Sequence, residues 1–186
     1  SYLGFAAKVT SDAGEVAGAR GLVLPGVGAF GDAMRELKQR GLIPVITAAL
    51  QNGRPFLGIC LGYQLLFAAS EESPGVPGLG VLPGEVVRFP ERLKVPHMGW
   101  NNARVVRDHP VMSGVGAGSF FYFVHSYYAR PGREEDVLTR TDYGLEFASG
   151  AARGNLVAFQ FHPEKSSAPG LRILENFARM CGMERG

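Results

Sequence analysis

The stretch FLGICLGYQLL, residues 56–66, places Cys60 between Gly58 and Gly62, where a short apolar run passes into a helical pattern. Flanking glycines keep Cβ atoms out of the crowded space of a tight strand-to-helix turn, a place where hydrolases hold a nucleophile. The positive end of the following helix favours a thiolate, and the amide of Leu61 points into the same space, where it can hold an oxyanion. The alternative is that Cys60 is a small buried hydrophobic residue beside two turn glycines.

A general base is available in the segment QFHPEKS, residues 160–166, where His162 follows a strongly apolar run and Glu164 comes shortly after it. Because parallel strands bind ligands at their carboxyl edge, we expect His162 to meet Cys60 there. His162 would take the thiol proton and later protonate a leaving group, while Glu164 would fix the imidazole tautomer. On its own, His-Pro-Glu is also typical of an ordinary loop after a strand.

A third segment, LPGVGAF at residues 24–30, also comes at the end of an apolar run. Its glycines free the backbone to present an amide toward a neighbouring ligand. Taken alone, the Pro-Gly pair needs no role beyond turning the chain.

Short apolar β-type runs alternate with helical patterns in the first part of the chain. We expect strands at 21–24 and 54–59, and helices from Asp32 to Gly41, from Pro44 to Asn52-Gly53 and over 62–69. Runs at 81–87, 120–124, 145–147 and 156–161 should add antiparallel strands, and residues 171–181 a closing amphipathic helix. The predicted fold class is α/β, with three layers and a mostly parallel open sheet carrying helices on both faces.

Composition narrows the classes of function. The chain has 186 residues, of which 46% are hydrophobic, which is ample for a core. Its 19 Lys and Arg are scattered among 17 Asp and Glu, so neither nucleic acid nor a membrane surface is expected as a partner. The two cysteines, Cys60 and Cys181, favour a reducing, cytoplasmic setting, and no ligand spacing suggests a metal or an organic cofactor.

Together, the three segments resemble the class I (triad) glutamine amidotransferase family, whose members release ammonia from glutamine with a Cys-His-Glu triad. The Gly-x-Cys-x-Gly-x-Gln and His-x-Glu patterns of that family are matched by Gly58, Cys60, Gly62, Gln64, His162 and Glu164. The resemblance runs from about Gly21 to the C-terminal helix and implies a flavodoxin-like fold. It assigns Cys60 as nucleophile, His162 as acid and base, and Glu164 as the group that orients His162.

Within this family, the segments PGVGAFGDAM (25–34), PHMGWN (96–101) and FYFVHSYY (121–128) resemble the glutaminase subunits of imidazole glycerol phosphate synthases. Those enzymes act in histidine biosynthesis. The resemblance implies L-glutamine as substrate and a (β/α)8-barrel cyclase subunit as the partner in a heterodimer. The cyclase would use the ammonia to make imidazole glycerol phosphate and AICAR.

The resemblance also assigns binding roles. Glutamine would be contacted by Gly26, Gly58, Gln64, His125, Ser126 and Tyr127, and the oxyanion by the amides of Leu61 and Val27. A surface facing the cyclase would include Pro96, Met98, Trp100, Asn101 and Lys165. From the residues alone, Trp100 is better explained as a half-buried aromatic in an Asn-rich turn, and Lys165 as a solvated lysine. His97 and His109 are expected in loops, and Cys181 in ordinary packing.

Val27 introduces a condition on catalysis, because a β-branched residue strongly resists positive φ. We expect the Gly26–Val27 peptide to point the wrong way at rest. Binding of the partner and its nucleotide would then flip this peptide and make glutamine hydrolysis conditional on the complex.

Residues 1–186 are expected to form one amidotransferase domain, without the family's first strand and most of its first helix.

Three alternative functions stay open at this point. Other class I glutaminase subunits, serving pyridoxal phosphate, anthranilate or aminodeoxychorismate synthesis, would carry a similar triad. A stand-alone γ-glutamyl hydrolase would be active without a partner. A catalytically silent scaffold would only regulate a partner enzyme.

Overall fold

The structure, a computed structural model, describes residues 3–184; residues 1, 2, 185 and 186 of the predicted domain lie outside the described part. Its strands are β1 (Leu22–Leu24), β2 (Phe56–Ile59), β3 (Ala69–Ser70), β4 (Gly84–Arg88), β5 (His97–Asn102), β6 (Arg104–Val105), β7 (Phe120–His125), β8 (Tyr127–Pro131), β9 (Val137–Asp142), β10 (Glu146–Arg153) and β11 (Leu156–Phe159). Its helices are α1 (Ala13–Gly18), α2 (Phe30–Gln39), α3 (Leu42–Gln51), α4 (Leu61–Gln64) and α5 (Ser167–Met180), with 3₁₀ turns η1 (Pro110–Met112), η2 (Glu134–Asp136) and η3 (Pro163–Lys165).

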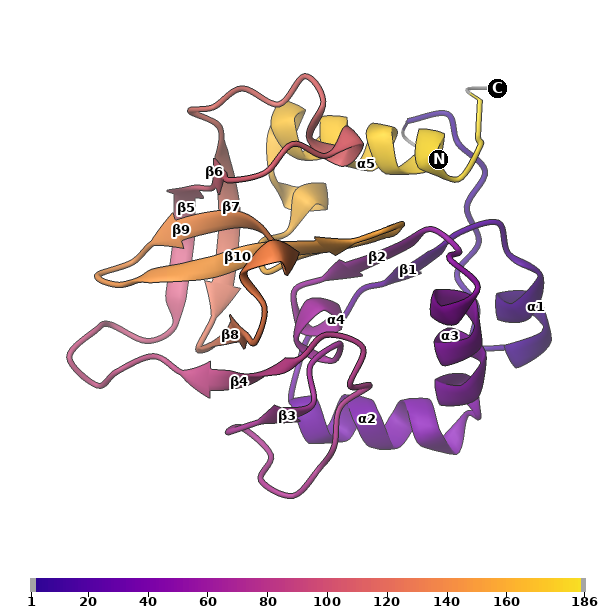
Figure 1. Cartoon of the computed structure of the whole chain (residues 1–186), viewed down its shortest axis with the longest axis horizontal. Coiled ribbons are helices and arrows are strands. Elements are labelled where there is room, and N and C mark those ends of the chain that lie inside the picture. The colour runs from indigo at the N-terminus through magenta and orange to yellow at the C-terminus, as the bar shows by residue number, and fades with distance from the viewer. Residues whose placement is uncertain (1–2, 185–186) are drawn as a thin grey trace.

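A mixed sheet forms the frame of the molecule (Figure 1). Strand β2 lies between β1 and β11 and is parallel to both, so that Gly58 stands opposite Leu24 on one side and Ala158 on the other. The sheet continues in the order β11-β10-β8-β4 through antiparallel pairs, and β3 closes it parallel to β4. Strands β5 and β7 form a separate antiparallel pair. The predicted α/β fold with both kinds of pairing is confirmed, but the sheet is not mostly parallel. Among the described residues three of its strand pairs are parallel and five are antiparallel, because the hairpin strands β8 to β10 enter the same sheet.

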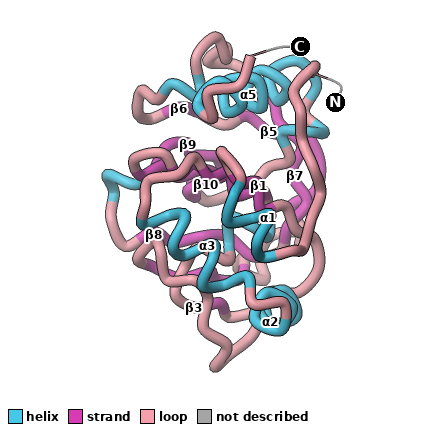
Figure 2. Tube along the Cα trace, turned by 90° about the vertical axis from the view of Figure 1, so that its right-hand side faces the viewer, coloured by secondary structure: helices cyan, strands magenta, loops and turns pink. Residues whose placement is uncertain are grey.

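Helices cover both faces of the sheet, with α5 over one face and α2, α3 and α4 over the other (Figures 1 and 2). The alternation of side chains along β2 explains the layers. Phe56 packs into the cluster that includes residues of α2 and α3, whereas Leu57 and Ile59 pack into the cluster that includes Ile173 and Phe177 of α5. Because β2 is buried on both faces, it reads as a continuous apolar run. Within residues 3–184, the helices are too short or too polar to cross a membrane.

The start of α2 differs from the sequence prediction. Asp32 is not the N-cap, because the helix begins at Phe30 and Ala29 is the cap residue. The Phe30 amide instead donates to the Glu72 carboxylate at 2.7 Å, so a distant loop caps the helix. Asp32 lies in the first turn, where a carboxylate still stabilises the positive helix end.

The predicted helix over 62–69 is too long, since α4 ends at Gln64. After α4, the carbonyl groups that would continue the helix accept hydrogen bonds from residues 79–81 instead. The carbonyls of Leu65 and Leu66 accept from the amides of Leu79 and Val81 at 2.8 and 2.9 Å. Tertiary pairing therefore overrides the local helical pattern.

Residues 97–102 form a strand rather than the turn that their composition alone favoured. Strand β5 pairs with β7 along its whole length, with His97 opposite His125 and Trp100 opposite Tyr122. His97, expected in a loop, is therefore a buried strand residue. Smaller differences are that β4 begins at Gly84, β11 ends at Phe159, and α1 is not predicted from the sequence.

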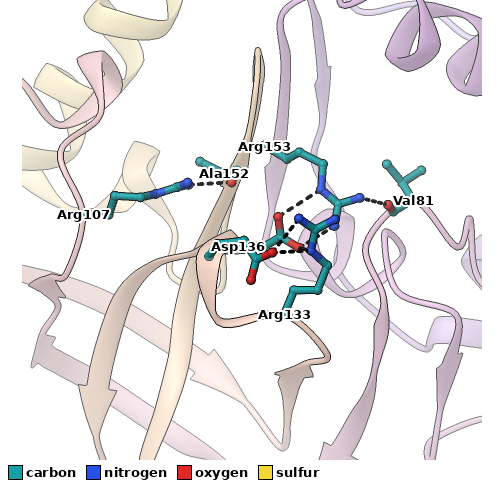
Figure 3. A network of polar contacts seen from close by, with 7 residues as sticks. Val81, Arg107, Arg133, Asp136, Ala152 and Arg153 are labelled. Atoms are coloured by element: carbon teal, nitrogen blue, oxygen red, sulfur yellow. Dashed lines mark hydrogen bonds and ion pairs between the residues drawn. The ribbon is translucent and has the colours of Figure 1, made fainter.

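A buried ion pair links η2 to β10 and, through its arginine, to the loop before β4 (Figure 3). The Asp136 side chain is 4% exposed and forms a bidentate ion pair with Arg153, whose Nη1 also donates to the Val81 carbonyl at 2.9 Å. Arg133 approaches the same carboxylate at 3.9 Å. Asp136 thus has both oxygens paired, as a buried charge requires.

We expect Arg153→Met to lower the free energy of unfolding by about 2–3 kcal/mol, because it leaves the Asp136 carboxylate buried with a weak partner. The effect is smaller than for a fully enclosed pair because the Arg153 side chain is 36% exposed. Urea unfolding measures it. The control is Arg104→Met, which breaks the exposed Arg104–Glu146 pair and should cost less than about 0.5 kcal/mol. Equal losses in the two variants would contradict the assignment.

Candidate active site

Cys60 occupies a strained turn at the carboxyl end of β2. Its φ of 53° and ψ of −107° are values that a non-glycine residue rarely adopts, and its amide donates to the Phe159 carbonyl of β11 at 2.8 Å. The turn is closed by Gly62, where a Cβ would lie 1.8 Å from the Leu24 carbonyl oxygen. The glycine after Cys60 is therefore required by the close approach of β1, as the sequence pattern indicates.

His162 lies just beyond β11 and is 2% exposed. Its amide donates to the Tyr122 carbonyl at 2.9 Å, and its carbonyl accepts from the Ser166 hydroxyl at 2.5 Å. Its Nδ1 is 2.7 Å from Oε1 of Glu164, which fixes Nδ1 as the protonated ring nitrogen when the ring is neutral. The other nitrogen, Nε2, is left to face the reacting groups.

The charge of the His162 ring depends on its neighbours. The Cys60 sulfur is the larger influence and the Glu164 carboxylate the second, and together they raise the pKa of His162 to about 9 against the opposing effect of burial. Among the described residues, Nε2 has no hydrogen-bond partner of normal geometry. His162 and Cys60 line the same pocket, without a hydrogen bond of normal geometry between them.

The Gly26–Val27 peptide has the orientation expected at rest. The Leu61 amide donates to the Gly26 carbonyl oxygen at 3.4 Å, so this oxygen points at the position where an oxyanion donor is needed. In a trans peptide the N–H points away from the C=O, and the Val27 amide is therefore turned from the Leu61 amide. This is the orientation expected of the peptide at rest, and the role of the Val27 amide as an oxyanion donor stays a prediction.

A pocket of about 340 Å³ brings most of the predicted residues together. Its lining comprises Val27, Gly28, Cys60, Leu61, Gln64, Glu72, Pro96, Val124, His125, Ser126, Tyr127 and His162. Gly26 and Gly58 are not part of this lining. A Cβ on Gly26 would lie 3.0 Å from that of Leu61, and one on Gly58 would lie 2.9 Å from the Gly62 carbonyl oxygen, so a larger residue would be crowded at either position. No group of three or more His, Cys, Asp or Glu side chains in residues 3–184 is arranged to hold a metal ion.

Comparison with known proteins identifies this arrangement. The sequence model of the family "Glutamine amidotransferase class-I" matches residues 7–181. The chain belongs to this family. Solved structures agree on the fold of the amidotransferase: one described as a glutamine amidotransferase has a TM-score of 0.77 at 23% identity and covers 97% of this chain and 89% of its own.

Several curated relatives at about 50% identity to this amidotransferase carry the name imidazole glycerol phosphate synthase subunit HisH. That of Moorella thermoacetica is 54% identical over 178 residues, which are 96% of this chain and 85% of the relative. That of Syntrophotalea carbinolica is 50% identical over 185 residues, covering 96% and 90%. That of Aquifex aeolicus is 53% identical over 158 residues, covering 85% and 76%.

Gln160 is a site residue of this amidotransferase that the sequence analysis missed. Its side chain is fully buried, and its Nε2 points at the Cys60 sulfur at 3.8 Å. Its Oε1 accepts from Nε2 of Gln64 at 3.0 Å, and the same Gln64 nitrogen donates to the Tyr127 carbonyl at 3.0 Å. The signal in the sequence was its position two residues before His162 at the end of a buried strand.

The residues predicted to face a partner lie mainly on β5, next to the pocket. Met98 and Trp100 are 62% and 54% exposed, and Phe120 at the start of β7 is 55% exposed. Lys165 lies over the ring of Tyr122 at 6.0 Å. The remaining predicted members differ, since Pro96 lines the pocket and Asn101 is hydrogen-bonded inward to the Asp142 carbonyl at 2.8 Å.

We expect Cys60→Ala and Glu164→Gln each to lower the pKa of His162 from about 9, because each removes a group that stabilises the imidazolium. In the wild type, the raised pKa means that the protonated ring stabilises the fold fully below about pH 6.5, and that this contribution is lost as pH rises through about 9. Nitrogen NMR of the histidine rings measures both changes. The His109 signal is the internal control, and a His162 titration unmoved in Cys60→Ala would contradict the assignment.

Proposed function

We propose that this chain is the glutaminase subunit of an imidazole glycerol phosphate synthase. It hydrolyses L-glutamine to glutamate and ammonia, and the ammonia passes to a (β/α)8-barrel cyclase subunit that makes imidazole glycerol phosphate and AICAR in histidine biosynthesis. The observation that carries this proposal is about 50% identity, across nearly the whole chain, to proteins of that one name. The pocket that joins Cys60 to His162 and Gln64 supports the chemistry.

The first half of the reaction forms a covalent intermediate. The Cys60 thiolate attacks the side-chain carbonyl carbon of glutamine, and the electron pair of the C=O moves onto oxygen. His162 then gives the proton on Nε2 to the amide nitrogen as the C–N bond breaks. Ammonia departs and a γ-glutamyl thioester remains on Cys60.

The second half regenerates the thiolate. His162 Nε2 takes a proton from water, and the resulting hydroxide attacks the thioester carbon. The C–S bond breaks, and glutamate leaves the pocket. Glu164 acts throughout by holding Nδ1, so that the proton in transit is always the one on Nε2.

In the resting structure neither of the two proposed oxyanion donors is free. The Leu61 amide is occupied by the Gly26 carbonyl, and the Val27 amide is turned away from it. A flip of the Gly26–Val27 peptide frees the Leu61 amide and brings the Val27 amide beside it. We propose that the cyclase and its nucleotide substrate drive this flip, so that ammonia is released only where it is used.

The partner and the setting follow from the same surface and the same chemistry. The exposed apolar side chains Met98, Trp100 and Phe120 form the face proposed to meet the cyclase.

We place the reaction in the cytoplasm, because a cysteine nucleophile must stay reduced and the two cysteines are free thiols.

The direct test is glutamate release from L-glutamine by the chain alone and by the chain with the cyclase subunit and its nucleotide. We expect little release alone and a rise of at least about 10²-fold in the complex, the size of effect of one oxyanion donor. Cys60→Ala should abolish release in both. Strong activity without the partner would favour a stand-alone γ-glutamyl hydrolase, and silence in both would indicate a scaffold.

Val27→Gly tests the peptide flip. Glycine removes the cost of about 1–2 kcal/mol that a side chain meets at positive φ, so release by the isolated chain should rise about tenfold. Val27→Ala keeps the Cβ and should rise less. The activities are compared without the partner, and a Val27→Gly variant as silent as the wild type would contradict the role given to this residue.

A further inference from the structure

Two buried histidines lie side by side next to the pocket, His97 on β5 and His125 on β7. His97 and His125 face each other directly across β5 and β7, and Nδ1 of His97 lies 2.9 Å from Nε2 of His125. Both side chains are almost fully buried, at 3% and 6% exposure. The chemistry proposed above uses neither ring.

The hydrogen bonds at the two ends of this pair set the position of every proton in it. His125 Nδ1 is 2.7 Å from the Tyr127 carbonyl, which can only accept, so Nδ1 carries the proton. In a neutral ring Nε2 must then accept, and the donor is Nδ1 of His97. Nε2 of His97 accepts in turn from the Asn101 amide nitrogen at 3.2 Å.

Both rings are held neutral by their surroundings. Burial lowers the pKa of His97 to about 4 and that of His125 to about 3. His97 is stacked between Tyr143 and Phe123, with ring centroids 4.1 and 4.7 Å away. A neutral ring can donate from only one nitrogen, so the chain of hydrogen bonds has a single direction.

The Tyr127 carbonyl joins this chain to the nucleophile. It also accepts from Gln64 Nε2 at 3.0 Å, and the same nitrogen donates to Gln160 Oε1 at 3.0 Å. Gln160 in turn points its amide at the Cys60 sulfur. A continuous set of buried and part-buried hydrogen bonds thus runs from Asn101 to Cys60.

The other end of the chain belongs to the exposed strand. Along β5, His97 and Asn101 point inward, whereas Met98 and Trp100 point outward and are mostly exposed. Because inward and outward residues alternate on one short strand, a shift of β5 imposed from outside must move His97 and Asn101. A buried chain of hydrogen bonds resists such a shift or passes it on, since each broken bond leaves a buried group unpaired.

We propose that His97 and His125 are positioning residues that couple β5 to the glutamine pocket, by fixing the Tyr127 carbonyl and through it the Gln64 amide. The coupling rests on the proposed function, because it requires a partner on the outer face of β5. The positioning of Gln64 by the two histidines does not depend on the proposed function, because all of its hydrogen bonds lie within this protein.

The first test is nitrogen NMR of the histidine rings in the chain alone. Both His97 and His125 should be neutral and protonated on Nδ1 alone, and the cyclase subunit should shift both signals but leave that of His109 in place. Tautomer exchange in either ring, or protonation on Nε2, would contradict the proposed hydrogen-bond chain from Asn101 to Cys60. So would a complex that leaves both signals unmoved.

The second test is a double-mutant cycle on glutamine hydrolysis in the complex. His97→Phe keeps the stacked ring and removes its hydrogen bonds; we expect KM for glutamine to rise about tenfold with a smaller change in kcat. His125→Phe should do the same, and the double variant should be no worse than either single one, because each breaks the same chain. The control is His109→Phe, because His109 takes no part in these hydrogen bonds and its replacement should leave KM and kcat unchanged.

Purely structural histidines would give additive losses that follow the drop in thermal stability, and unchanged KM in His97→Phe would overturn the proposal. Should either buried variant fail to fold, Asn101→Leu removes only the terminal donor and should raise KM in the same direction. If the wild-type complex releases no glutamate, the proposed function fails. NMR of the isolated protein still decides whether the hydrogen bonds between His97, His125 and the Tyr127 carbonyl exist.

Discussion

The parallel pairing of β2 with β11 is the constraint on which the site depends. Its last registered pair joins Ile59 to Phe159, and the next hydrogen bond, from the Cys60 amide to the Phe159 carbonyl, pins the turn to the neighbouring strand. Everything that follows the two strand ends is then forced to one edge of the sheet. Cys60 emerges from one strand, and Gln160 and His162 emerge from the other.

A second constraint is steric and concerns the loop after β1. The end of β1, from which that loop leaves, passes so close to the cysteine turn that Gly62 has no room for a Cβ beside the Leu24 carbonyl. The same proximity lets the Gly26 carbonyl occupy the Leu61 amide. One close approach therefore builds the nucleophilic turn and also holds it in its resting state, because a backbone amide can serve either a carbonyl or an oxyanion.

Four of the buried polar side chains lie at or next to the pocket and are joined by hydrogen bonds. Gln64, Gln160, His97 and His125 are all buried, and each has its hydrogen bonds within the chain. Unpaired, such groups would cost free energy, whereas a fully paired set holds each side chain in one orientation. Rigid placement of the residues that line the pocket follows from this pairing.

Much of this could be predicted from the sequence. Local patterns determined the apolar strands, the glycine-flanked Cys60 and the His162–Glu164 pair, because these depend on residues close in the chain. Only the tertiary structure decided the early end of α4, the capping of α2 by Glu72, the strand character of 97–102 and the roles of His97 and Gln160. The reason is physical: each depends on hydrogen bonds to a partner far away in the sequence, and no local pattern records which partner that is.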